Sequence, residues 1–178
     1  MQNLKSIWQS FKKDAATERG SSRKPGGKLG VEQKIDRFET SFRNLDAPQT
    51  RLLGGEIVTQ LNVYRSTFPP NTEVQFNEDI KIFCIMIRGL SVSVEQAIRT
   101  ADGHGTGLAG VRVLIDNAYA NLVCDAQHAR LEKLRGMPVP QGFFASRSHL
   151  REIARVDREV QAYGRRIGEN AQTYMGMF

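Results

Sequence analysis

Cysteine is scarce in this sequence, since Cys84 and Cys124 are the two in a chain of 178 residues. Two cysteines cannot form the set of disulfides with which small secreted domains compensate for a small core. Both lie among apolar residues, so we expect two buried thiols in a protein of a reducing compartment.

Long apolar runs are also missing. No run approaches the roughly 18 residues that an α-helix needs to span a bilayer. The first residues, MQNLKSIWQSFKKD, lack the uninterrupted apolar core of a signal peptide. We therefore expect a cytosolic or nuclear protein.

Catalytic and metal-binding motifs are absent as well. The sequence has no GxSxG, no Walker lysine motif and no HExxH. His104, His128 and His149 are scattered, and neither cysteine lies near them at ligand spacing. We expect no enzyme activity, no metal and no cofactor.

One glycine-rich segment, residues 102–110, is predicted to be a loop, and it contains a GxGxxG pattern ahead of a helix. A dinucleotide site would need a strand directly before this pattern, and the preceding residues favour a helix. A looser phosphate site remains open here. Free backbone N–H groups would begin the next helix, with Arg99 and Arg112 close by in sequence.

Positive charge is abundant, with 25 basic against 19 acidic residues and a pI near 9.6. Such a balance favours polyanionic partners. Residues 1–30 hold seven basic and two acidic side chains, and their Gly, Ser and Pro content predicts a flexible basic arm. Within this arm Leu4, Ile7, Trp8 and Phe11 share one helical face. That helix, within residues 1–13, could bind a membrane surface or a partner groove, or dock on its own domain.

The remaining pattern predicts a mainly α fold. Apolar periodicity favours helices over about 31–45, 53–64, 94–98 and 111–136, whereas alternation and branched residues at 72–76 and 80–87 favour two short strands. We expect a four-helix-bundle-like core with a small β element over residues 31–146. The arm of residues 1–30 precedes this core, and an extra amphipathic helix over 147–178 follows it.

The C-terminal helix has a narrow apolar seam on a heptad frame, and the residues between are mostly Arg and Glu. Such a seam suits a partner helix and thus an oligomer, but it equally suits packing on helices of its own domain. The seam residues are Ile153, Val156, Val160, Tyr163 and Ile167.

From about residue 49 to 144 the order of features resembles the coat proteins of rod-shaped plant viruses, tobacco mosaic virus and its relatives. The corresponding features are a helix through Tyr64, a proline-bearing turn, two short strands around an acidic turn, an arginine-bearing helix and loop, and a long returning helix. In this sequence the turn falls at 68–71, the strands at 73–76 and 81–83, and the acidic turn between them at 77–79. The arginine-bearing helix falls at 92–99 and the returning helix carries its basic and acidic pair at 112–116. The stretch at 134–136, before a turn with aromatic residues at 143–144, is also similar.

The resemblance implies a four-helix bundle that assembles helically around single-stranded RNA, in the virion and the host cytoplasm. It implies phosphate contacts for Arg99 and Arg112, with Asp116 nearby. It also implies that intersubunit carboxylates repel one another and drive disassembly, as close carboxylates share a proton. The candidate carboxylates are Glu73, Glu78 and Asp102.

Two other classes stay open. A matrix-type protein of an enveloped negative-strand RNA virus would bind both membrane and nucleocapsid, and its lysine-rich start would be similar to this one. A non-viral helical adaptor would dimerise through residues 150–177 and bind no nucleic acid.

Overall fold

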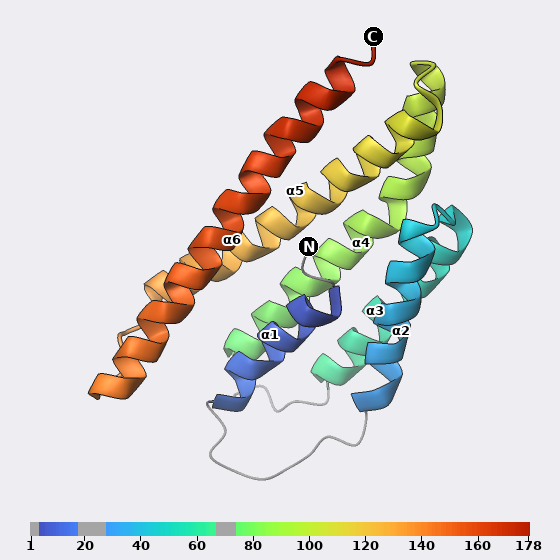
Figure 1. Ribbon diagram of the computed structural model, residues 1–178. Helices are drawn as coiled ribbons and strands as arrows, with labels where there is room; N and C mark the ends of the chain where they lie inside the picture. The colour runs from blue at the N-terminus through green and yellow to red at the C-terminus, as the bar shows by residue number, and fades with distance from the viewer. Residues whose placement is uncertain (1–3, 18–27, 67–73) are drawn as a thin grey trace. The chain divides into compact units, whose positions relative to one another are not determined.

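A computed structural model describes residues 4–17, 28–66 and 74–178, and these residues form six α-helices and no strand (Figure 1). The helices are α1 (Leu4–Thr17), α2 (Lys28–Arg43), α3 (Ala47–Ser66), α4 (Val74–Gly103), α5 (Gly107–Gly136) and α6 (Phe143–Met175). The mainly α prediction is therefore confirmed. The predicted basic segment at 18–27 and the proline pair at 69–70 lie outside the described residues.

The chain forms two compact units, Met1–Glu95 and Gln96–Phe178. Unit 1 contains α1, α2, α3 and most of α4, and unit 2 contains the end of α4 with α5 and α6. The boundary lies within α4, inside the segment 31–146 that the sequence analysis assigned to one core.

Contacts in unit 1 join its four helices in a closed ring. Lys5 of α1 pairs with Asp36 of α2 at 2.8 Å, and Lys34 of α2 pairs with Glu56 of α3 at 2.8 Å. Arg51 of α3 pairs with Glu95 of α4. Trp8 of α1 packs on Phe83 of α4 with ring centroids 5.1 Å apart, which closes the ring. The fully buried side chains of unit 1 include Leu4, Ile7, Ile35, Phe38, Ile57, Leu61, Ile80, Phe83 and Ile87.

The amphipathic helix predicted near the N-terminus exists, as α1. Leu4, Ile7 and Trp8 are buried, and the backbone N–H of Leu4 donates to Glu39 of α2 at 3.3 Å. Of the alternatives left open for this helix, docking on its own domain is the one found in the structure.

The predicted β element is wrong. Residues 80–87 are helical, as are 74–76, and all lie in α4. Ile80, Phe83, Ile87, Leu90 and Val94 are buried at spacings of three and four, the period of one helix face. Within eight residues a branched apolar run does not distinguish strand from helix, and the longer pattern decides. The strands that carried part of the coat-protein resemblance are therefore absent from these residues.

The glycine-rich loop is shorter than predicted. Helix α4 continues to Gly103 and α5 begins at Gly107, so the turn is confined to residues 104–106. Gly105 and Gly107 have φ of 67° and 58°, a left-handed conformation in which glycine carries no Cβ penalty. Position 110 in α5 is occupied by glycine, and a Cβ there would overlap the side chain of Thr106.

In unit 2, α5 and α6 form an antiparallel hairpin. Asp116 contacts Arg166, Cys124 contacts Val160 and Arg130 contacts Glu152. The residue numbers of successive contacts therefore rise along α5 and fall along α6. Leu131, Leu134 and Val156 form a core cluster against which Met137, Ile153 and Val160 pack.

The heptad seam of the C-terminal helix thus faces α5 of the same chain. Val156 and Tyr163 are buried, and Ile153 and Val160 join the cluster with Leu131 and Leu134. Packing on the chain's own helices, the second alternative that the seam left open, is the arrangement in the structure.

Candidate nucleic-acid interface

The arginines that the resemblance assigned to phosphate contacts lie on two different helices. Arg99 and Arg112 are exposed, on α4 and α5 either side of the 104–106 turn. Asp116 accepts hydrogen bonds from Arg166 and Asn170 of α6. The carboxylate expected to support Arg112 is thus engaged by α6.

The three candidate carboxylates differ in their surroundings. Glu78 forms an ion pair with Lys81 one turn along α4. Asp102 is exposed in the last turn of α4, and Glu73 lies outside the described residues. Their proposed action between subunits stays a prediction.

A line of exposed arginines runs along α6, which we call the arginine stripe and define as Arg147, Arg151, Arg158 and Arg165. Their spacings of four, seven and seven place them within about 40° on one face of the helix. The stripe spans about 27 Å along the helix axis at 1.5 Å per residue. The apolar seam residues, such as Val156, lie on the opposite face, so packing on α5 turns the stripe outward.

The stripe is not neutralised by any residue that the structure describes. None of its arginines has a hydrogen bond or ion pair with any described residue, although α6 carries Glu152, Asp157, Glu159 and Glu169. Four guanidinium groups that keep their donors free on one face provide a row of sites for phosphate, which guanidinium binds bidentately.

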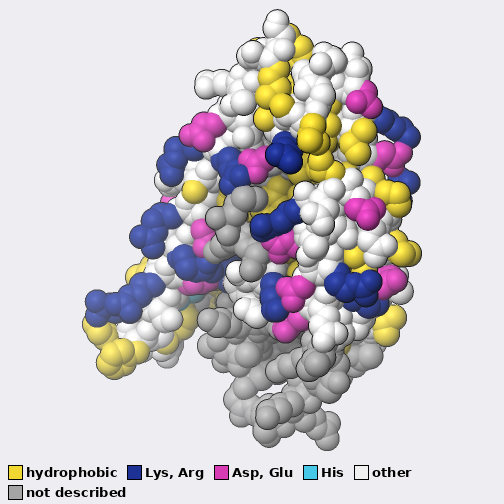
Figure 2. All heavy atoms as spheres, turned by 45° about the vertical axis from the view of Figure 1, so that its right-hand side comes forward, with side chains coloured by type: hydrophobic (Ala, Val, Ile, Leu, Met, Phe, Trp, Pro, Cys, Tyr) yellow, Lys and Arg dark blue, Asp and Glu magenta, His cyan; other side chains and the backbone are white. Residues whose placement is uncertain are grey.

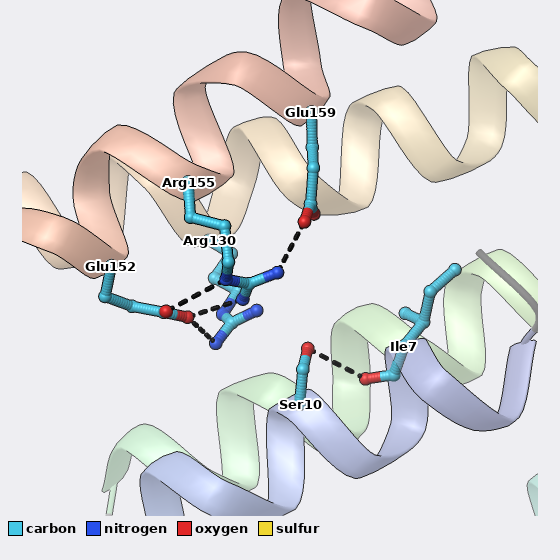
Figure 3. Close-up of polar contacts among 6 residues, drawn as sticks. All are labelled: Ile7, Ser10, Arg130, Glu152, Arg155 and Glu159. Carbon is cyan, nitrogen blue, oxygen red and sulfur yellow. Dashed lines mark hydrogen bonds and ion pairs between the residues drawn. The ribbon is translucent and has the colours of Figure 1, made fainter. Parts of the chain in front are cut away.

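The other arginines of the hairpin, apart from Arg112, are paired. Glu152 accepts from Arg130 of α5 at 2.7 Å and from Arg155 at 2.6 Å, and Arg155 also pairs with Glu159 (Figure 3). The hydrogen bond that Arg155 donates to Glu152 is the main cause that raises the pKa of Arg155, against the effect of burial. This network holds the arginines that face α5.

Arg135 and Arg166 are paired as well. Arg135 donates to Asp157 at 3.0 Å, and Arg166 donates to Asp116 through two nitrogens. The hydrogen bond with Asp116 is the main cause that raises the pKa of Arg166. Carboxylates of α5 and α6 therefore neutralise the paired arginines, whereas the arginines of the stripe have no such partner among the described residues.

An open surface depression adjoins the stripe. Its lining includes Ser148, Arg151, Ala154 and Arg158, together with Glu152 and Arg155, which pair with each other. Small side chains between arginines leave room for a phosphate group between two guanidinium groups.

The stripe has a sequence signal that was not used. Arginine at 147, 151, 158 and 165 follows the same heptad frame as the seam, half a turn away. The sequence analysis recorded the intervening residues only as mostly Arg and Glu, and it did not separate arginines with a carboxylate partner from those without one.

Other chemistry is limited in the described residues. They contain no group of three His, Cys, Asp or Glu side chains that could hold a metal ion. No helix among them is long and apolar enough to cross a membrane. Cys84 and Cys124 are free thiols, and burial raises the pKa of each.

Comparison with known proteins gives no relative. The chain matches no protein-family model, no curated protein and no solved structure.

Proposed function

We propose that this protein is a non-enzymatic structural protein that binds single-stranded RNA through its phosphates. The observation that supports this most directly is the arginine stripe of α6, with four exposed guanidinium groups and no carboxylate partner among the described residues. Contacts to phosphate carry no base information, so binding is independent of sequence.

The stripe takes over part of the role that the resemblance gave to Arg99 and Arg112. Both are exposed and remain in the proposal as additional phosphate contacts, in the same unit as the stripe. Asp116 is assigned a positioning role instead, because it holds Arg166 and so fixes α6 on α5.

The proposal includes self-assembly, as in the virus coat proteins that the sequence resembles, with a four-helix bundle in unit 1 as the building block. The closed ring of contacts among α1, α2, α3 and α4 supports the bundle. Since the heptad seam is used within unit 2, copies would meet through other surfaces. Exposed apolar residues on unit 1 offer such surfaces, namely Leu52, Val63 and Ile85.

The experiment measures the affinity of the full chain for a fluorescent oligouridylate by anisotropy. One variant replaces the whole stripe with glutamine, and a second carries Arg99→Gln and Arg112→Gln. A charge-matched control replaces four exposed basic residues of unit 1 with glutamine, namely Arg37, Arg51, Lys81 and Arg88.

We expect the stripe variant to bind at least tenfold more weakly than the control, because four local phosphate contacts are lost in one and only general charge in the other. An equal loss of affinity in both variants would show that the stripe acts only through its net charge, and it would contradict the proposal. Electron microscopy with and without RNA tests assembly separately, with rods that lengthen with RNA as the expected result.

A further inference from the structure

The turn that joins α5 to α6 exposes large apolar side chains, and we call this end of the hairpin the apolar tip. Phe143 and Phe144 begin α6 and are 71% and 84% exposed. Val139 in the turn and Leu150 two turns into α6 are also mostly exposed. Apolar side chains that gather in one exposed patch, unlike scattered ones, indicate an interaction surface.

The tip is held in a defined conformation. Residues 137–142 contain Pro138 and Pro140, and Gly142 has φ of 102°, which only glycine adopts without strain. The backbone N–H and the hydroxyl of Ser146 both donate to the carbonyl of Gly142 at 3.0 Å and close the first turn of α6. The rings of Phe143 and Phe144 meet edge to face, 5.6 Å apart.

The segment that carries the tip has charge of one sign. Residues 133–151 contain Lys133, Arg135, Arg147 and Arg151 and no Asp or Glu, and of these Arg135 is paired with Glu132 and Asp157. Arg147 and Arg151 have no partner among the described residues. Figure 2 shows the resulting arrangement at the end of the hairpin, with hydrophobic side chains outermost and Lys or Arg side chains directly beside them.

We propose that the apolar tip inserts into the interfacial region of an anionic membrane, with Arg147 and Arg151 on the lipid phosphates. A lipid surface supplies in one place an apolar layer for aromatic side chains and negative charge for the arginines beside them. The arrangement needs no helix that crosses the bilayer, and none is found in the described residues.

Other occupants fit the tip less well. A second copy would bring two sets of positive charge together, which opposes tip-to-tip contact at close range. RNA bases stack on aromatic rings, but Val139 and Leu150 have no ring to offer and would stay exposed. Charge complementarity and the aliphatic members of the tip therefore favour lipid.

This interaction goes beyond the proposed RNA binding and does not depend on it. The two share Arg147 and Arg151, while Arg158 and Arg165 of the stripe lie farther along α6. RNA and anionic lipid would consequently compete for the first two arginines.

The test is co-sedimentation of the full chain with phosphatidylcholine vesicles, with and without phosphatidylserine. The variant Phe143→Ser/Phe144→Ser removes the tip, and Phe143→Trp/Phe144→Trp keeps a large aromatic there. The matched control, Leu108→Ser/Met175→Ser, removes two exposed apolar residues at the start of α5 and the end of α6, the other end of the same hairpin. Since all four positions are exposed, circular dichroism and the unfolding midpoint are expected to stay unchanged in every variant.

We expect the wild type and the control to sediment with vesicles that contain phosphatidylserine. The serine variant should bind at least tenfold more weakly, and the tryptophan variant as well as wild type or better. An unchanged vesicle affinity in the serine variant would overturn the proposal. So would a serine variant that loses affinity for oligouridylate and not for vesicles, or one whose oligomeric state alone changes, since these results assign the tip to RNA stacking or to self-association.

Discussion

Arg166 of α6 donates hydrogen bonds to Asp116 of α5 from two guanidinium nitrogens, and its Nε lies 2.6 Å from Oδ2 of Asp116. Asn170, one turn later, donates to the same carboxylate at 2.7 Å. Asp116 therefore accepts three hydrogen bonds from α6, which fixes the register of the hairpin beyond its apolar cluster.

The first prediction concerns this contact. Arg166→Ala should lower the free energy of unfolding by about 1–2 kcal/mol, because a partly buried carboxylate loses a bidentate partner. Arg165→Ala, one residue earlier on the exposed stripe, should change it by less than about 0.5 kcal/mol. Urea unfolding followed by circular dichroism measures both, and equal effects would refute the assignment of Arg166 as a positioning residue.

Two adjacent glycines of α3 give a matched pair in unit 1. A Cβ on Gly54 would overlap the hydroxyl of Ser91 and lie 3.1 Å from the ring of Phe38, while a Cβ on Gly55 meets nothing within 4 Å. Gly54→Ala should destabilise the protein by about 1–3 kcal/mol through overpacking. Gly55→Ala should stabilise it by about 0.5–1 kcal/mol through helix propensity. Thermal unfolding measures both, and we expect a lower midpoint than wild type for Gly54→Ala and a higher one for Gly55→Ala.

The heptad seam gives a third prediction. Val156 is fully buried against Leu131 and Leu134, so Val156→Ala should cost about 1.5–3 kcal/mol. Val139→Ala at the exposed tip is the control and should cost little. Because the seam is filled within one chain, the unfolding midpoint of Val156→Ala should depend on protein concentration to the same extent as that of the wild type. A weaker concentration dependence in Val156→Ala would show that the seam also joins two chains.

The helices that the sequence predicted well share one property, a long apolar period with a clear stop. The first predicted helix ends at residue 45, directly before α3 begins at Ala47, and Asp46 there accepts from the N–H of Gln49. The predicted end at residue 136 is the end of α5. The strand prediction at 80–87 failed because a short branched run was judged without its continuation through Leu90 and Val94.

The site was harder to predict than the fold, because it depends on which charges are paired. Arg155 and Arg158 lie three residues apart on the same helix, yet Arg155 pairs with Glu152 and Glu159 and Arg158 pairs with no described residue. The apolar tip was likewise hidden, since Phe143 and Phe144 are as typical of a core as of a surface. Only their exposure separates the two cases.

The thiols give a prediction on pH. Burial raises the pKa of Cys84 and Cys124, so both are protonated in the folded state at a pH where an unfolded thiol ionises. The stability that each contributes is complete below the unfolded value of about 8.5 and is lost as the pH rises through the folded value. Unfolding free energy should therefore fall above about pH 8.5. The variant Cys84→Ala/Cys124→Ala should reduce this dependence, and an unchanged profile would contradict it.

The arginine stripe makes a quantitative prediction on salt. Each phosphate contact to a single strand contributes about 0.7 to the slope of log affinity against log salt concentration. Arg158→Gln should reduce the magnitude of the slope by about 0.7, and replacement of all four stripe arginines should reduce it by about 3. Arg37→Gln on α2, which is equally exposed, should leave the slope unchanged while it lowers the net charge by the same amount. If Arg37→Gln and Arg158→Gln shift the slope equally, RNA is attracted by the whole protein and not by α6. A slope that falls stepwise only along the stripe would instead place successive phosphates along the helix.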